Sequence, residues 1–167
     1  MNKSSIISEL EKLDNVKLKT DIPLKNYTTI KAGGPASLLV IPTNIKALQK
    51  ILKTTAEAKI DLPIFIMGKG SNVIVSDNGY PGLVINTLEL DHADIKKDRI
   101  KAECGITLKK LAGMAYEHSL SGLEFAGGIP GTLGGALYMN AGAYGSEIKD
   151  LIVKVEAYDY KGKKVIL

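Results

Sequence analysis

The apolar residues near the N-terminus recur at the spacing of an amphipathic helix and then change to a continuous run. Isoleucines and leucines stand three and four positions apart over residues 6–13, and Ser4 or Ser5 can cap a helix before them. We expect this helix to form an arm over residues 1–22. After a turn at two glycines, the apolar run over residues 36–41 predicts a short strand.

A second helical period follows this strand. Asn44 stands at a cap position before a run whose apolar residues make one face from Ile45 to Leu52, and we expect the helix to end near Lys59. The segment "LPIFIMGKGSN" then predicts a buried strand that leads into a polar glycine loop. A strand, a helix and a second strand in this order are typical of a partly parallel sheet.

The second half of the chain mixes strand pairs with helices. The segments "GLVINTLE" and "RIKAECG" predict strands, and "TLKKLAGMAYEHS" predicts a helix capped by Thr107. The last residues, "LIVKVEAYDYKGKKVIL", predict a hairpin that turns at Lys161 and Gly162. The mixture favours an α+β fold, and 167 residues with 45% hydrophobic content indicate one domain, here with two lobes.

Composition excludes several classes of function. The net charge of +4 comes from lysines spread along the whole chain, which does not indicate nucleic-acid binding. No apolar run reaches the roughly 18 residues of a membrane span, and the first residues do not resemble a secretory signal, so we expect a cytoplasmic protein that binds no membrane. One cysteine and two histidines predict neither a disulfide nor a metal site.

The first candidate binding segment is "MGKGSNVIV", from Met67 to Val75. Glycines and small residues let several backbone N–H groups point into one concavity that suits a phosphate. The segment is neither a Walker loop, because Lys69 precedes glycine, nor a dinucleotide fingerprint, because Val73 replaces the third glycine. A tight turn after a buried strand explains the loop equally well.

The second candidate is "GLEFAGGIPGTLGGALYMNAGAYG", from Gly122 to Gly145, which holds eight of the chain's 17 glycines. Thr132 can cap a short helix whose N-terminal amides would attract an anion, and Asn140 lies among small residues that leave room for a flat ring. Close packing of elements is the alternative explanation. Two glycine loops together fit a diphosphate-bridged dinucleotide better than a single phosphate.

These two segments, together with "PLKNYTTIKAGGPA" (Pro23 to Ala36), resemble the UDP-N-acetylenolpyruvoylglucosamine reductase family of peptidoglycan synthesis. The segment "GIPGTLGG" alone is also similar to the wider flavin-binding superfamily that includes vanillyl-alcohol oxidase. The resemblance implies a two-lobed α+β FAD-binding domain of the vanillyl-alcohol oxidase (PCMH) type over residues 23–167, with FAD between the lobes. A C-terminal substrate-binding domain would be absent from this chain.

The resemblance also implies which residues contact FAD. The glycine loops would approach the diphosphate, and the small residues near Asn140 would flank the flavin. The implied residues are Gly68, Lys69, Gly70, Ser71, Asn72, Gly128, Ile129, Pro130, Gly131, Gly134, Gly135, Asn140, Gly142 and Ala143, with Tyr27, Thr28 and Gly105 ranked below them.

The implied reaction is a reduction by NADPH. NADPH reduces FAD, and the reduced flavin passes hydride to the enolpyruvyl group of a UDP-sugar, giving UDP-N-acetylmuramate after protonation by a protein acid. No catalytic residue is assigned in this chain, because the family's catalytic serine and glutamate would lie beyond Leu167. We therefore expect FAD binding without full turnover. Another flavin-dependent oxidoreductase of the same fold and a non-catalytic nucleotide-binding module are the alternatives.

Four other residues attract attention without being assigned catalysis. His118 is expected at the C-terminal end of a helix, and Cys104 at an apolar strand end is expected to be buried and inert. Glu124, the only charged side chain in the second loop, is expected to accept backbone hydrogen bonds. For Tyr144, stacking near the ring and packing between the lobes are equally supported.

Overall fold

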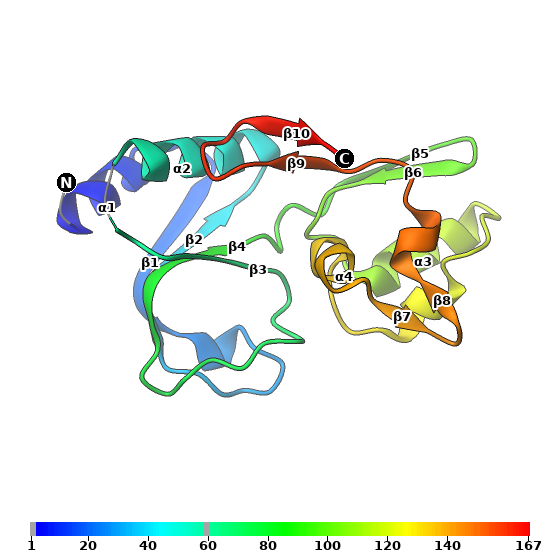
Figure 1. Cartoon of the computed structure of the whole chain (residues 1–167), viewed down its shortest axis with the longest axis horizontal. Helices are drawn as coiled ribbons and strands as arrows, with labels where there is room; N and C mark the ends of the chain where they lie inside the picture. The colour runs from blue at the N-terminus through cyan, green and yellow to red at the C-terminus, as the bar shows by residue number, and fades with distance from the viewer. Residues whose placement is uncertain (1–2, 59–60) are drawn as a thin grey trace.

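A computed structural model gives the structure of the protein and describes residues 3–58 and 61–167 (Figure 1). Two groups of elements stand side by side in this view. The first lobe, up to residue 86, is a sheet with helices packed against it. The second lobe, residues 90–152, is built around two helices and short strands. The mixed helix and strand content confirms the α+β class.

The first lobe contains a four-stranded sheet in the spatial order β1-β2-β4-β3. Its strands are β1 (Val16–Pro23), β2 (Pro35–Pro42), β3 (Ile64–Met67) and β4 (Tyr80–Asn86). Strand β1 is antiparallel to β2, whereas β2 and β3 both run parallel to β4. Helix α2 (Ile45–Glu57) connects β2 to β3. The partly parallel sheet predicted from the strand-helix-strand order is therefore confirmed.

The central strand β2 is buried on both faces, which explains its continuous apolar sequence. Leu38 and Val40 pack on one face in a cluster with residues of the helices, and Leu39 and Ile41 pack on the other face with Leu24. Leu24 belongs to the short 3₁₀ helix η1 (Leu24–Asn26). A strand covered on both sides needs apolar residues at successive positions rather than at alternate ones.

The helix α2 begins as the sequence predicted. Asn44 is its N-cap, and the Asn44 side chain accepts a hydrogen bond from the Ala47 amide at 2.9 Å. The last residue of α2 is Glu57, whereas Lys59, where we expected the end, lies outside the described residues.

The first 22 residues differ from the helical arm that we expected. Helix α1 covers only Lys3–Glu11, so Ser4 and Ser5 lie inside it rather than at its cap. Strand β1 then continues past residue 22, where we expected the arm to end, and pairs with β2 along its length. The apolar face of α1 places fully buried Ile6 and Leu10 in the cluster of the sheet. These contacts hold the segment within the first lobe, because burial of such side chains is favourable only against another apolar surface.

The second lobe is built around helices α3 (Leu108–Glu117) and α4 (Leu133–Met139). Thr107 caps α3 as predicted, and its Oγ1 accepts a hydrogen bond from the Lys110 amide at 3.2 Å. The other elements of this lobe are the strands β5 (Ala93–Lys96), β6 (Arg99–Ala102), β7 (Gly142–Ala143) and β8 (Ser146–Glu147) and the 3₁₀ helices η2 (Glu124–Gly128) and η3 (Ile148–Leu151). Strand β5 pairs antiparallel with β6, which lies within the segment "RIKAECG" where a strand was predicted.

The C-terminal hairpin connects the two lobes. Strands β9 (Glu156–Tyr158) and β10 (Lys164–Ile166) pair antiparallel, which confirms the predicted hairpin. In Figure 1 the hairpin leaves the second lobe and returns to α2 in the first. Tyr158 packs against the core of the first lobe, and a Cβ at Gly162 would stand 2.9 Å from the Gln49 carbonyl oxygen of α2. The turn of the hairpin therefore lies directly against the helix.

Candidate functional site

The first glycine loop begins where β3 ends and is anchored from the neighbouring strand. Asn86, 1% exposed at the end of β4, donates a hydrogen bond from Nδ2 to the Gly68 carbonyl at 3.2 Å. The Asn86 Oδ1 accepts another from the Leu88 amide at 3.1 Å. Lys69 and Asn72 of the same loop are exposed, whereas Gly70 is buried. The loop therefore has a fixed backbone and presents polar side chains outward.

The segment that contains Tyr27 and Thr28 packs directly on this loop. The Thr29 amide donates to the Gly70 carbonyl at 2.9 Å, and Gly70 has a positive φ of 67°. A Cβ at Gly70 would stand 2.2 Å from the Tyr27 carbonyl oxygen. Both features require glycine at this position, because an L side chain would be strained and would collide with backbone.

The second glycine loop connects η2 to α4 and is fixed to the start of α3. The Leu108 amide donates to the Gly131 carbonyl at 3.1 Å, and residues Thr107 and Thr132 form an isolated β-bridge. Glu124 accepts a hydrogen bond from the Gly122 amide at 2.7 Å, which confirms its predicted role in fixing the loop.

Two N-terminal amides of α4, those of Leu133 and Gly134, are not free to bind an anion, which corrects our expectation for them. The Leu133 amide donates to the Ile106 carbonyl at 2.9 Å, and the Gly134 amide donates to the Cys104 carbonyl at 2.8 Å. Thr132 occupies the cap position, but its side chain forms no cap hydrogen bond. The chain preceding α3 already satisfies these two donors, so they are not available to a phosphate.

The two glycine loops, far apart in the sequence, meet where the two lobes touch. A Cβ at Gly68 would stand 2.2 Å from Thr132 Oγ1, so the first loop lies against the start of α4. A Cβ at Gly131 would stand 3.4 Å from Ser71 Oγ. We call this contact region, formed by Gly68 and Ser71 on one side and Gly131 and Thr132 on the other, the seam.

The glycines of the predicted site fall into two groups. At Gly68, Gly70, Gly105, Gly134 and Gly142, a Cβ would stand less than 3 Å from another protein atom, so close packing explains the glycine. At Gly128, no described atom beyond its chain neighbours lies within 4 Å of that point. At Gly131 and Gly135, the nearest atoms are side-chain oxygens at 3.4 and 3.6 Å.

The glycines with open space at the Cβ position show whether the site has room for a cofactor close to the backbone. Gly135 lies inside α4, where glycine costs up to about 1 kcal/mol relative to alanine. Packing within the chain explains neither this cost at Gly135 nor the choice of glycine at Gly128 and Gly131. A bare backbone with open space beside it suits a ligand that comes closer than a side chain would allow. These residues therefore fit an extended nucleotide cofactor at the seam.

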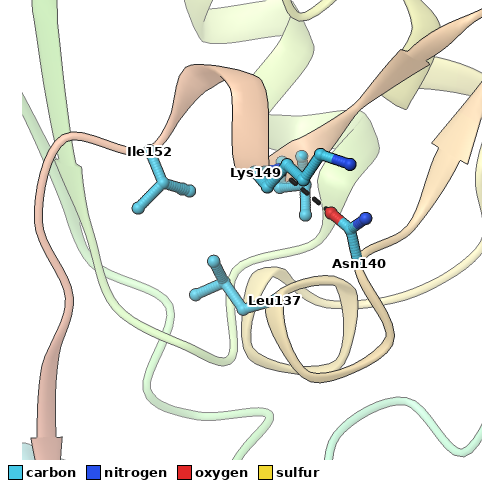
Figure 2. A pocket seen from close by; sticks show the side chains of 5 residues that line it. Leu137, Asn140, Lys149 and Ile152 are labelled. Carbon is cyan, nitrogen blue, oxygen red and sulfur yellow. Dashed lines mark hydrogen bonds between the residues drawn. The ribbon is translucent and has the colours of Figure 1, made fainter. Parts of the chain in front are cut away.

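Asn140 lies at the opposite end of α4 from the seam. It closes the helix with a left-handed φ of 45°, and its Oδ1 accepts a hydrogen bond from the Lys149 amide at 3.2 Å (Figure 2). Gly142 and Ala143 follow in β7, which pairs with β8. An α-helix of this length separates them from the seam by roughly 10 Å. Any one ligand that contacts both groups must therefore extend along α4.

A pocket of about 500 Å³ lies beside this end of α4. Figure 2 shows Leu137 and Ile152 facing each other across it, with Asn140 and Lys149 on one side. Lys149 also pairs with Glu147, and the hydrogen bond from Lys149 lowers the pKa of that carboxyl group. The pocket is apolar with a polar edge, which suits a planar ring system.

The remaining candidates keep structural roles. His118 is the C-cap of α3, and its Nδ1 lies 2.9 Å from the Met114 carbonyl oxygen. Cys104 is half-buried, and burial raises the pKa of its thiol. Gly105 is buried, its amide donates to the Leu90 carbonyl at 2.7 Å, and a Cβ there would stand 1.9 Å from the Thr87 carbonyl oxygen. Tyr144 is 96% exposed and packs between no described elements.

A family model described as FAD binding domain matches residues 36–167. The chain belongs to this FAD-binding family. It is 49% identical over 150 residues to the UDP-N-acetylenolpyruvoylglucosamine reductase of Caldicellulosiruptor saccharolyticus, covering 90% of this chain and 47% of the relative. Identity to the Clostridium tetani protein of the same name is 43% over 161 residues, covering 96% and 52%. The chain thus spans about half the length of these curated relatives.

Solved structures show the same fold. A UDP-N-acetylenolpyruvylglucosamine reductase from Thermus caldophilus superimposes with a TM-score of 0.73 at 33% identity, covering 91% of this chain and 52% of that one. Berberine bridge enzyme from Eschscholzia californica superimposes with a TM-score of 0.69 at 15% identity, covering 97% and 37%. The second likeness concerns the fold alone. Together these neighbours confirm the fold class and the family resemblance that the motifs indicated.

Two residues of the site were missed by reasoning from the sequence. Asn86 was seen only as part of a strand, although a polar residue at the end of a buried apolar run was an available signal. Thr132 was seen only as a cap, and its position against Gly68 depends on the packing of the lobes. Among the described residues, no helix is long and apolar enough to cross a bilayer.

Proposed function

We propose that this chain is the FAD-binding part of an NADPH-dependent reductase that converts the enolpyruvyl ether of UDP-N-acetylglucosamine to UDP-N-acetylmuramate. The family match and the relatives of that name support the proposal, and its structural support is the open backbone at Gly131 in the seam and at Gly128 and Gly135 on either side of it in the chain. The product is a peptidoglycan precursor, so the protein would act in the cytoplasm and serve cell-wall growth, cell shape and division.

The first loop and the second loop would hold FAD from opposite sides of the seam. Backbone N–H groups of residues 68–72 and the bare backbone at Gly128, Gly131 and Gly135 would approach the diphosphate, because no Cβ keeps the ligand away there. Lys69 would add a positive charge from the exposed side of the loop. Ile129 and Pro130 would shape the approach between the open glycines.

The rest of α4 would lie along the extended cofactor. Asn140, Gly142 and Ala143 would flank the flavin end, and Tyr27 and Thr28 would hold the first loop in place through their contact with Gly70. When bound, FAD supplies the hydride-transfer chemistry between NADPH and the enolpyruvyl group. This chain's own residues bind and orient it.

We propose that the groups that bind the UDP-sugar and protonate the product lie in the half of the relatives that this chain does not match. The chain alone would then bind FAD without completing turnover. Fusing residues 1–167 to the unmatched half of the Clostridium tetani relative tests this division. Oxidation of NADPH that depends on the enolpyruvyl UDP-sugar is expected, whereas FAD binding without any oxidation would indicate a nucleotide-binding module.

The direct test of the cofactor site is a titration of the purified chain with FAD, followed by flavin fluorescence, with FMN for comparison. Saturable binding with preference for FAD is expected, since only FAD has a diphosphate to span the seam. Gly131→Val should weaken FAD binding at least about tenfold, because its side chain would occupy the open space beside Ser71.

Gly113→Val is the matched control, because Gly113 is an exposed position on α3 with no described atom near its Cβ site. It should leave the FAD affinity unchanged. A folded wild-type chain that binds no FAD would contradict the proposed cofactor, and wild-type affinity in Gly131→Val would remove Gly131 from the site.

A further inference from the structure

The apolar clusters of the two lobes are separate, apart from one side chain. Of the three clusters found among the described residues, two consist of first-lobe residues and the third consists of second-lobe residues. The exception is Tyr158 of β9, which packs against the cluster formed by α1, α2 and the sheet. Lobes that meet without a large apolar interface are expected to move relative to each other. The segment that carries Tyr158 is therefore suited to restrict such motion.

We call this segment, residues 153–167, the clasp. It leaves the second lobe after η3, crosses to α2 and turns back (Figure 1). At its turn, a Cβ at Gly162 would stand 2.9 Å from the Gln49 carbonyl oxygen and 3.6 Å from the Lys53 amide nitrogen. The tip of the clasp therefore rests on the backbone of α2, about one helical turn in extent.

The clasp has a fixed shape of its own. At its turn, Asp159 Oδ1 accepts hydrogen bonds from the Lys161 and Lys163 amides, both at 2.8 Å. At its open end, Val155 and Leu167 exchange backbone hydrogen bonds at 2.9 and 3.0 Å. A hairpin that is fixed at both ends docks on α2 or leaves it as a unit.

The base of the clasp lies beside the second lobe. Glu156 forms ion pairs with Lys154 and Lys164 at 3.3 and 2.9 Å. Hydrogen bonds from Lys164 and Lys154 lower the pKa of the Glu156 carboxyl group, and the charge of Lys101 in β6 lowers it further. The clasp thus has its base next to β6 of one lobe and its tip on α2 of the other.

We propose that docking of the clasp on α2 holds the two lobes in the arrangement that closes the seam, and that a ligand bound across the seam in turn holds the clasp docked. The second part rests on the proposed function, in which FAD contacts both lobes. A ligand that needs both lobes binds only the fraction of chains in which they face each other, so undocking raises its apparent dissociation constant. By thermodynamic reciprocity, binding of the ligand favours docking by the same factor.

The first part is tested without ligand, by pulsed EPR distances between spin labels on the two lobes of the full chain. Ser8→Cys in α1 and Glu117→Cys in α3 place the labels at exposed positions, and Cys104→Ala removes the native thiol in every variant. The chain with the native clasp should give one narrow distribution of distances.

Two changes undock the clasp from different contacts. Tyr158→Ala removes the ring that packs on the first lobe, and the methyl group of Gly162→Ala would collide with the Gln49 carbonyl. Each should broaden the distribution of distances. Ile166→Ala is the control within the clasp, where the side chain is exposed, and Leu13→Ala is the control for loss of a contact with the same core. Both controls should keep the narrow distribution.

The second part is tested by fluorescence titration with FAD in the same four variants. Tyr158→Ala and Gly162→Ala should bind FAD at least about fivefold more weakly than wild type, the lower end of typical coupling between sites. Ile166→Ala and Leu13→Ala should bind it as wild type does. In the wild-type chain, FAD should also slow hydrogen exchange at the amides of β9, which lie outside the proposed cofactor site.

The outcomes separate the two proposals. A broad distribution with the native clasp, or a narrow one in both undocking variants, would show that the clasp does not set the arrangement of the lobes. Wild-type FAD affinity in both undocking variants would overturn the coupling and leave the proposed cofactor standing. If the folded wild-type chain binds no FAD, the proposed function fails together with the coupling, and the label distances still decide whether the clasp holds the lobes.

Discussion

Replacing Gly70 by alanine tests whether the first loop is held by the packing of its backbone. Gly70 has a φ of 67°, and its Cβ site lies 2.2 Å from the Tyr27 carbonyl oxygen and 3.0 Å from Thr28 Cα. These are backbone atoms, so they cannot rotate aside as the end of a side chain would. The same segment is fixed by the hydrogen bond from the Thr29 amide to the Gly70 carbonyl at 2.9 Å.

The cost of Gly70→Ala follows from two effects. The left-handed conformation costs an L residue about 1–2 kcal/mol, and forcing an extra methyl group into a packed site costs about 1–3 kcal/mol. The expected loss is therefore about 2–5 kcal/mol, a large part of the roughly 5–15 kcal/mol that stabilises an ordinary domain.

Urea unfolding followed by circular dichroism measures this loss. Gly128→Ala is the matched control, because its Cβ would enter open space and Gly128 has no positive φ. Its free energy of unfolding should stay within about 0.5 kcal/mol of wild type. Equal free energies of unfolding in the two variants would refute the reasoning that packing against Tyr27 and Thr28 requires glycine at position 70.

Two further predictions concern residues that flank the site. Asn86→Ala should lower the free energy of unfolding by about 1–3 kcal/mol, because the Gly68 carbonyl and the Leu88 amide lose their partner. Asn78→Ala, at an exposed position, is the control in the same urea assay. Equal stability of the two variants would contradict the anchoring role of Asn86. Burial raises the pKa of the Cys104 thiol, so alkylation of the folded chain should reach half its maximum rate at a higher pH than alkylation of the urea-unfolded chain. The raised pKa also means that the contribution of this thiol to stability is complete below its unfolded pKa of about 8.5 and is lost as pH rises above it. Coincident pH profiles of alkylation for the folded and unfolded chain would show that folding does not shift the pKa of the thiol.

Much of the fold followed from local patterns. The caps at Asn44 and Thr107 and the apolar run of β2 were predicted because each depends on residues close together in the sequence. Strand β1 was missed because it is an edge strand with alternating lysines, and its stability comes from pairing with β2 rather than from its own residues. The same reason explains why the residues before Pro23 belong to the first lobe.

The sequence by itself determined the family, the two glycine loops and the α+β class, because motifs and periodicity are properties of neighbouring residues. Only the tertiary structure decided what each glycine does. Gly70 and Gly134 meet backbone or side-chain atoms of distant segments, whereas Gly128 and Gly131 face open space. Thr132 occupies the cap position of α4 without a side-chain cap hydrogen bond, and it lies against Gly68 of the other lobe. These contacts join residues far apart in the chain, and no local pattern encodes such distances.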